Sequence, residues 1–172
     1  CFEFEAVVAG RVVSVLDASE EFPGGKLRPS GHGIPILFPY PNRIRGGKYA
    51  FQSRSFELPL DQILNDSEGN AIHGLCVDRP WRVTESQASS AMGVFRLSAD
   101  APERLAFWPA DFEIEFRYSV KGATLRADVT IRNPSDRPLP WGLGTHPYFR
   151  LPLSKESAVG RCTVEAPVTR QW

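Results

Sequence analysis

Histidines are the residues of this chain best suited to acid-base chemistry, and the chain has three of them. His73 stands in the run Asn-Ala-Ile-His-Gly, and His146 in the run Gly-Thr-His-Pro-Tyr-Phe. A free imidazole titrates at about pH 6.5, so it can both give and accept a proton at neutral pH. A histidine in a turn is more often a hydrogen-bonded surface or packing residue, and we assign no role to His32.

A segment rich in proline and aromatic residues, residues 33–44, contains Asn42 and Arg43 near its end. The arginine side chain presents a rigid fork of donors that spans adjacent oxygen atoms and keeps its charge. The opposing interpretation is a solvated loop charge, because Arg45 and Lys48 stand close by. The choice between the two depends on the three motifs taken together.

In their order along the chain, the three motifs resemble those of the aldose 1-epimerase (galactose mutarotase) family. That family shows a P-x-L-F-P-x-x-N-R-I stretch, then H-G, then H-P-Y-F, and the resemblance covers residues 10–152 or so. It implies that Asn42 and Arg43 bind the hydroxyls or the ring oxygen of a sugar. It also implies that His73 hydrogen-bonds the substrate and that His146 is the general acid on the ring oxygen.

The reaction that the resemblance implies is the exchange of the α and β anomers of a hexose such as glucose or galactose. The C1 hydroxyl loses a proton while the ring oxygen gains one, the open-chain aldehyde rotates, and the ring closes with the roles reversed. A positioned acid or base typically contributes about 10² to 10⁴ in rate to such a step. The expected partner is a small-molecule sugar, and neither a metal nor an organic cofactor is needed.

The base that deprotonates the C1 hydroxyl is the part of the family's site with no match in this chain. The resemblance implies a glutamate well downstream of the second histidine, with an aspartate between them that helps to hold the sugar. We therefore expect the chain to be the front part of a longer protein, inactive or weak as a catalyst on its own. If the base lay within these residues, Glu156 and Glu165 would be the first candidates.

Two aromatic residues flank His146, and the apolar face of a pyranose can pack on such rings. Trp141 and Tyr148 therefore join the candidate substrate-binding residues, although packing is the more frequent role of a tryptophan. Packing roles are expected for five other aromatic residues: Trp81, Trp108, Phe38, Phe107 and Phe149.

Short runs punctuated by 15 prolines and 14 glycines indicate strands joined by turns, so we predict an all-β fold. In residues 112–132, apolar and polar side chains alternate on both sides of Lys121-Gly122, which predicts an antiparallel hairpin. Residues 31–47 and 138–152 resist a strand interpretation, because prolines and glycines interrupt them. The family resemblance implies a large antiparallel β-sandwich. Further strands are expected at residues 2–8, 11–16, 49–58, 81–85, 94–99 and 161–165.

Composition excludes several classes of partner. Twenty Lys plus Arg balance twenty Asp plus Glu, so no basic surface favours nucleic acid or an anionic membrane. The apolar runs are shorter than the roughly 20 residues that cross a bilayer. Cys1, Cys76 and Cys162 are widely spaced, which favours free thiols, the last two buried, and a reducing compartment such as the cytoplasm. The length fits one domain, residues 1–172, and the oligomeric state stays open.

Two alternative functions compete with this interpretation. A hexose-6-phosphate epimerase relative would hold a phosphate with cations, and Arg43, Arg45 and Lys48 form a small basic cluster. A non-catalytic carbohydrate-binding sandwich would keep the aromatic residues and the Asn-Arg pair but would not need two histidines. A metal-dependent hydrolase is disfavoured, because no two histidines or cysteines stand at ligand spacing on one element.

Overall fold

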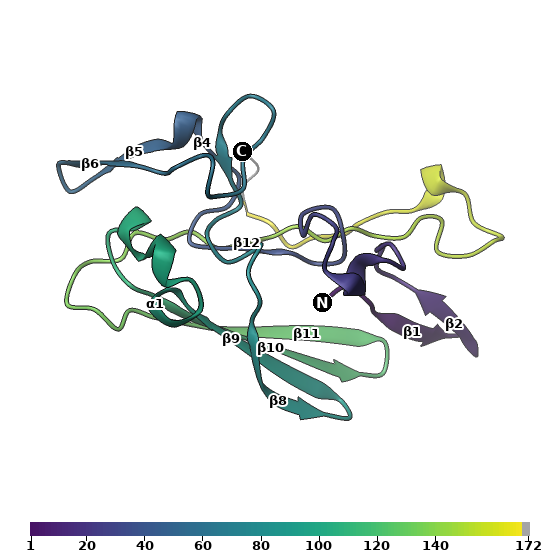
Figure 1. Cartoon of the computed structure of the whole chain (residues 1–172). Coiled ribbons are helices and arrows are strands. Elements are labelled where there is room, and N and C mark those ends of the chain that lie inside the picture. Colours follow the sequence, from purple (N-terminus) through teal and green to yellow (C-terminus); the bar gives the residue numbers. More distant parts are fainter. Residues whose placement is uncertain (170–172) are drawn as a thin grey trace.

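The structure is a computed structural model, and it describes residues 1–169. Strands and the loops between them dominate it, and the helices of the described residues are short (Figure 1). The largest sheet has four antiparallel strands in the order β11-β10-β9-β8. This architecture confirms the predicted all-β class. The strands of this sheet are β8 (Arg82–Gln87), β9 (Ser90–Arg96), β10 (Glu113–Lys121) and β11 (Thr124–Arg132).

The hairpin of β10 and β11 confirms the prediction for residues 112–132. Its alternating pattern places Ile114 and Phe116 in the core, where they are 0% and 3% exposed. Glu113 and Glu115 lie on the opposite face and both form ion pairs with Arg132 across the hairpin. One face of β10 therefore packs in the apolar core, and the opposite face forms ion pairs with β11.

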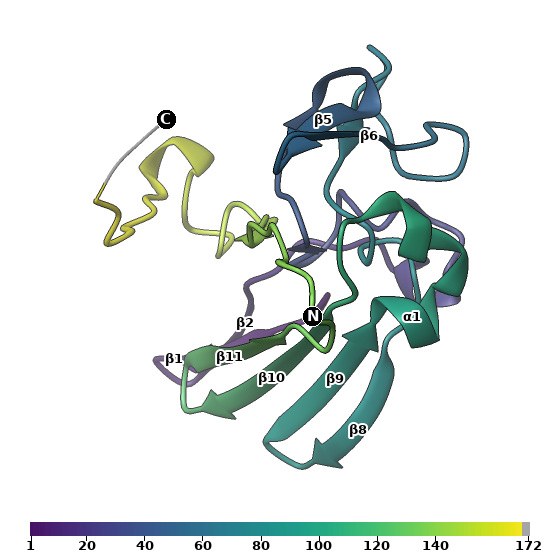
Figure 2. The same cartoon turned by 90° about the vertical axis from the view of Figure 1, so that its left-hand side faces the viewer.

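Two smaller hairpins lie outside this sheet. The first pairs β1 (Glu5–Val8) with β2 (Arg11–Ser14), close to the predicted strands. The second pairs β5 (Lys48–Phe51) with β6 (Arg54–Glu57) and stands apart from the four-stranded sheet (Figures 1 and 2). The prediction of a single strand over residues 49–58 is wrong, because the chain reverses at a two-residue turn with positive φ at both positions.

Short helical turns replace two predicted strand segments. β9 ends at Arg96 and is followed by α1 (Leu97–Asp100) and the 3₁₀ helix η3 (Pro102–Phe107), so the prediction for residues 97–99 is wrong. The carboxylate of Asp100 accepts the backbone N–H of Arg96 at 2.7 Å, which diverts that donor from the sheet. Residues 161–165 form no strand either, because η4 (Val159–Arg161) precedes irregular chain that leaves Val164 76% exposed.

Four two-residue strands cross the proline-rich and glycine-rich loops. They are β3 (Ile36–Leu37), β4 (Arg43–Ile44), β7 (Ala71–Ile72) and β12 (Gly144–Thr145). β3 pairs with β12 and β4 pairs with β7, both antiparallel. The two stretches expected to resist strand formation therefore contain three of these short strands, and their pairing joins distant parts of the chain. The remaining 3₁₀ turns are η1 (Phe22–Gly24) and η2 (Arg45–Gly47).

Phe38 anchors these loops to the sheet. Its ring is fully buried and packs edge-on against Phe112, with ring centroids 4.8 Å apart. Its carbonyl oxygen accepts the backbone N–H of Leu75 at 2.8 Å and the thiol of Cys76 at 3.4 Å. Burial raises the pKa of the Cys76 thiol to about 12. We call residues 38 and 74–76 the Phe38 junction.

Most packing predictions are confirmed. Trp108 is 6% exposed, and Trp81 and Phe107 pack against the buried cluster. The prediction for Phe149 is wrong, because its side chain is 43% exposed and only its backbone bridges to Leu16. The three cysteines are free, Cys76 buried, Cys162 half-buried and Cys1 exposed. Within residues 1–169, helices are too short and too polar to span a membrane.

Candidate functional site

The pairing of β4 with β7 places Asn42 and Arg43 beside His73. Arg43 lies opposite Ile72 in this short ladder, and the backbone N–H of His73 donates to the carbonyl oxygen of Asn42 at 3.0 Å. Asn42 adopts φ 57°, a left-handed conformation that asparagine tolerates better than most residues. Two of the three sequence motifs therefore meet through their main chains.

The pairing of β12 with β3 brings the third motif to the same place. Thr145 lies opposite Ile36, and the next residue, His146, donates its backbone N–H to the carbonyl oxygen of Pro35 at 3.3 Å. The imidazole rings of His73 and His146 then lie 6.4 Å apart, centroid to centroid, at an interplanar angle of 62°. A single small molecule can contact both rings at this separation.

The glycine after His73 is required by the Phe38 junction. Gly74 has φ 87°, and a Cβ atom there would lie 2.0 Å from the carbonyl oxygen of Phe38. His73 is itself left-handed, with φ 65°. The backbone therefore turns sharply at positions 73 and 74, directly after β7. The imidazole of His73 lies outside the strand, and the main chain continues into the core at Leu75.

Asp66 fixes the side chain of Arg43 but is not singled out by any of the sequence motifs. Arg43 Nε donates to Asp66 Oδ2 at 2.7 Å, and Arg43 Nη1 donates to Asn42 Oδ1 at 2.9 Å. The backbone N–H of Asn70, together with Arg43, holds the pKa of the Asp66 carboxyl well below its usual range. The run Asp-Ser-Glu-Gly-Asn at 66–70 is the one signal that could have identified this turn, since aspartate favours such turns.

His73 lies in a setting that favours the neutral imidazole. Its Nδ1 atom is buried and has no hydrogen-bond partner among residues 1–169. Burial, followed by the positive charges of His146, Arg28 and Arg43, lowers the pKa of His73. Arg28 comes from a loop that the sequence motifs do not cover, and its Nη2 donates to the carbonyl oxygen of Asn65 at 3.0 Å.

This setting predicts how stability responds to pH. Because the folded-state pKa of His73 is lowered, the unfolded chain binds more protons as pH falls through the unfolded-state value of about 6.5. The contribution of neutral His73 to the free energy of unfolding is therefore complete above about pH 6.5 and is lost as the pH falls below that value. A His73→Asn variant should lose less free energy of unfolding than the wild type between about pH 7.5 and about pH 5.5, measured by urea denaturation. Equal losses in the two proteins would contradict this assignment.

His146 is exposed and its ring is oriented by Tyr148. The two rings stack at 4.7 Å between centroids with an interplanar angle of 26°. Trp141 belongs to the same segment and is 57% exposed, and its ring lies 6.2 Å from that of Phe38. Within residues 1–169, no ring contact joins Trp141 to either histidine. Tyr148 is thus part of the histidine cluster, and Trp141 is an exposed aromatic residue of the same segment.

The basic cluster noted in the sequence is largely neutralised. Arg43 binds Asp66, and Lys48 Nζ lies 3.8 Å from Glu57 Oε1.

A hollow of about 560 Å³ lies between the N-terminal segment and the four-stranded sheet, and none of the candidate residues lines it. The histidine cluster combines an exposed His146 with a half-buried His73, and its chemistry is that of imidazole, guanidinium and amide groups.

A family model described as aldose 1-epimerase matches residues 8–170. The chain belongs to the aldose 1-epimerase family. The uncharacterized protein YihR of Escherichia coli (strain K12) is 32% identical over 127 residues, which cover 73% of this chain and 39% of YihR. A second uncharacterized protein of that organism, YphB, is 23% identical over 123 residues, 72% of this chain and 38% of YphB.

Solved structures share the fold. A galactose mutarotase-like protein of Clostridium acetobutylicum superposes with a TM-score of 0.72 at 24% identity, over 91% of this chain and 51% of that one. Slr1438 of Synechocystis sp. PCC 6803 gives a TM-score of 0.61 at 31% identity, over 79% and 43%. These similarities confirm the predicted mutarotase-like β-sandwich. The chain spans about half, or less, of the length of the relatives that it matches.

Proposed function

We propose that the protein is an aldose 1-epimerase that exchanges the α and β anomers of a hexose such as glucose or galactose. The observation that carries the proposal is the 6.4 Å separation of the His73 and His146 rings beside Asn42 and Arg43, in a chain of this family. Two imidazoles at this spacing can engage two oxygen atoms of one pyranose.

In this proposal, His146 is the general acid. Its exposed ring can reach a sugar, and stacking on Tyr148 holds the ring in one orientation. His146 gives a proton to the ring oxygen as the C1 hydroxyl loses its own, and takes the proton back when the ring closes. His73, kept neutral by its lowered pKa, hydrogen-bonds a sugar hydroxyl without adding a second positive charge.

Arg43 and Asn42 would hold the sugar in place. The bond to Asp66 fixes the guanidinium, so little side-chain freedom remains to be lost on binding. Nη2 of Arg43 has no hydrogen-bond partner among residues 1–169 and is left for a ligand oxygen. Trp141 and Tyr148 would receive the apolar face of the pyranose.

The base is proposed, from the family resemblance, to be a glutamate outside the residues described above. Glu156, the nearest candidate by sequence, is already paired with Arg11, whose Nη1 lies 3.1 Å from Glu156 Oε1. Both side chains of this pair are exposed to solvent. We also propose a reducing compartment, the cytoplasm, because the buried thiol of Cys76 is free.

Polarimetry tests the function directly. Freshly dissolved α-glucose and α-galactose should reach anomeric equilibrium faster with the full-length protein than in buffer, and residues 1–172 alone should be slower than the full-length protein. The absence of acceleration with any hexose, in a protein shown to be folded, would contradict the proposal. Acceleration by residues 1–172 equal to that of the full-length protein would place the base within them.

A hexose 6-phosphate is the second candidate substrate, and Arg28 is the observation that favours it. This guanidinium adds a positive charge close enough to His73 to lower its pKa, beyond the cluster noted in the sequence. The same polarimetric assay with the 6-phosphates separates the candidates. A strong preference for the phosphorylated sugar, lost in an Arg28→Gln variant, would favour the second.

A further inference from the structure

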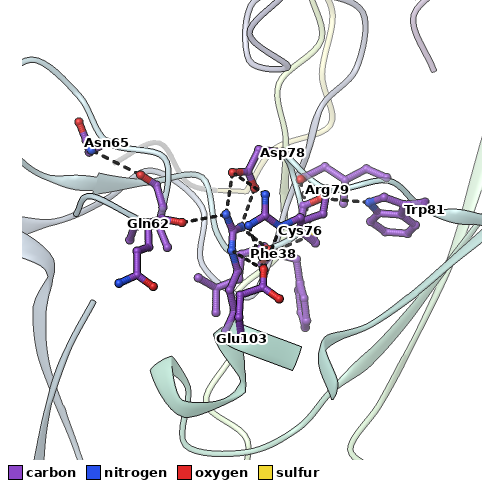
Figure 3. Close-up of polar contacts among 12 residues, drawn as sticks. Phe38, Gln62, Asn65, Cys76, Asp78, Arg79, Trp81 and Glu103 are labelled. Atoms are coloured by element: carbon purple, nitrogen blue, oxygen red, sulfur yellow. Dashed lines mark hydrogen bonds and ion pairs between the residues drawn. The ribbon is translucent and has the colours of Figure 1, made fainter. Parts of the chain in front are cut away.

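Arg104 of η3 is a charged side chain enclosed in the core, with 1% of its surface exposed. Its Nη1 and Nη2 atoms donate to the two carboxylate oxygens of Asp78, at 2.6 and 2.8 Å. The same two nitrogens donate to backbone carbonyl oxygens, Nη1 to Leu75 at 2.9 Å and Nη2 to Gln62 at 3.0 Å. Figure 3 shows Asp78 and Gln62 approaching this point from different parts of the chain.

Both carbonyl groups belong to segments that carry the histidine site. Leu75 lies in the Phe38 junction, directly after the His73-Gly74 turn. Gln62 lies in the loop that leads to Asp66, the carboxylate that fixes Arg43. The guanidinium of Arg104 therefore links the segment that follows His73 to the loop that carries the partner of Arg43, although neither segment is adjacent to η3 in the sequence.

Stability alone does not explain this arrangement. A buried ion pair loses the hydration of both charges, and well-packed apolar residues of similar volume are often as stable or more so. Apolar side chains cannot bind two carbonyl groups of two loops, whereas the planar fork of arginine can. The arrangement is further braced by Arg79, whose Nη2 donates to Glu103 Oε1 at 2.9 Å, next to Arg104 in η3.

We infer that Arg104, with Asp78, is a positioning residue of the histidine site, which sets His73 and Arg43 at their mutual distance without touching the substrate. The kinetic part of this inference rests on the proposed epimerase function. Its structural part does not, because the position and the environment of the His73 ring can be measured in the protein without any substrate.

The test replaces the ion pair by apolar residues in an Arg104→Met, Asp78→Leu double variant. We expect it to fold, and we expect the His73 ring resonances to shift in NMR spectra. The His73 pKa should rise toward its ordinary value, because a released loop hydrates the ring that burial now keeps neutral. For anomer exchange, kcat should fall by about 10- to 100-fold, the effect expected of a displacement of about 1 Å.

An Arg104→Lys variant keeps the inference testable if the double variant does not fold. Lysine retains a charge against Asp78, but its single ammonium group cannot span both carbonyls and both carboxylate oxygens. It should shift the His73 resonances in the same direction. The matched control is Arg117→Met, Glu85→Leu, which removes an ion pair of 2.7 Å on the four-stranded sheet, away from the site.

The outcomes are distinguishable. The inference would be overturned if the folded Arg104 variants left the His73 resonances, the His73 pKa and kcat unchanged. It would also be overturned if the Arg117 control changed them equally. If the His73 signals move only in the Arg104 variants while the wild type exchanges no anomers, the positioning role stands and the epimerase function fails.

Discussion

Replacing His146 with asparagine is expected to lower kcat for anomer exchange by about 10²- to 10⁴-fold, the contribution of a positioned general acid. Asparagine can still hydrogen-bond a sugar oxygen, but it has no proton to give at neutral pH. The side chain is exposed and stacks on Tyr148, so the substitution leaves no cavity in the core. Polarimetry or NMR exchange spectroscopy on the full-length protein measures the loss.

His32→Asn is the matched control for this experiment. His32 is also a loop histidine, whose Nδ1 accepts the backbone N–H of Ser19 at 3.2 Å and whose ring packs on Phe22. Its substitution should leave the exchange rate near that of the wild type. An unchanged rate in His146→Asn would contradict its role as the general acid. Sugar binding by the wild type and the variant, with exchange no faster than in buffer, would instead favour the non-catalytic carbohydrate-binding sandwich.

Gly74→Ala is expected to lower the free energy of unfolding by about 2–6 kcal/mol, the sum of backbone strain and overpacking. The new Cβ would lie 2.0 Å from the carbonyl oxygen of Phe38 and 2.4 Å from its carbonyl carbon, at φ 87°. No rotamer relieves an overlap between Cβ and backbone, so the Phe38 junction must open. Urea denaturation followed by circular dichroism measures the change.

Gly122→Ala separates the overlap from the conformational strain. Gly122 also has a positive φ, 58°, but its missing Cβ would meet no atom within 4 Å. We expect a loss of about 1–2 kcal/mol there, from the left-handed conformation alone. A loss at Gly74 no larger than that at Gly122 would show that the backbones at the junction are not in close contact.

Local patterns in the sequence predict the sheet better than the loops. The hairpin of β10 and β11 follows from strict alternation on both sides of one glycine turn. The reversal at Gln52 and Ser53 escapes prediction, because neither residue is typical of a turn with two positive φ angles. The short strands β3, β4, β7 and β12 have two residues each, too few for any periodicity, and form because distant segments pair.

The histidine site divides in the same way. Motif order identifies Asn42, Arg43, His73 and His146, and the structure places these four side by side, while their roles stay predictions. Asp66 fixes Arg43, whereas Arg28 and Arg104 bind backbone carbonyl groups of neighbouring segments. These are tertiary contacts between polar residues, and such residues carry no periodic signal. A buried arginine is especially hard to foresee, because arginine is most often a surface residue.

The thiol of Cys76 makes the Phe38 junction accessible to measurement. Alkylating reagents attack the thiolate, and burial against the Phe38 carbonyl keeps Cys76 protonated and shielded. Cys1 and Cys162 are more exposed, and we expect them to be modified first. The slower alkylation of Cys76 should then report the rate at which the chain next to His73 opens locally, and so measure motion at the site.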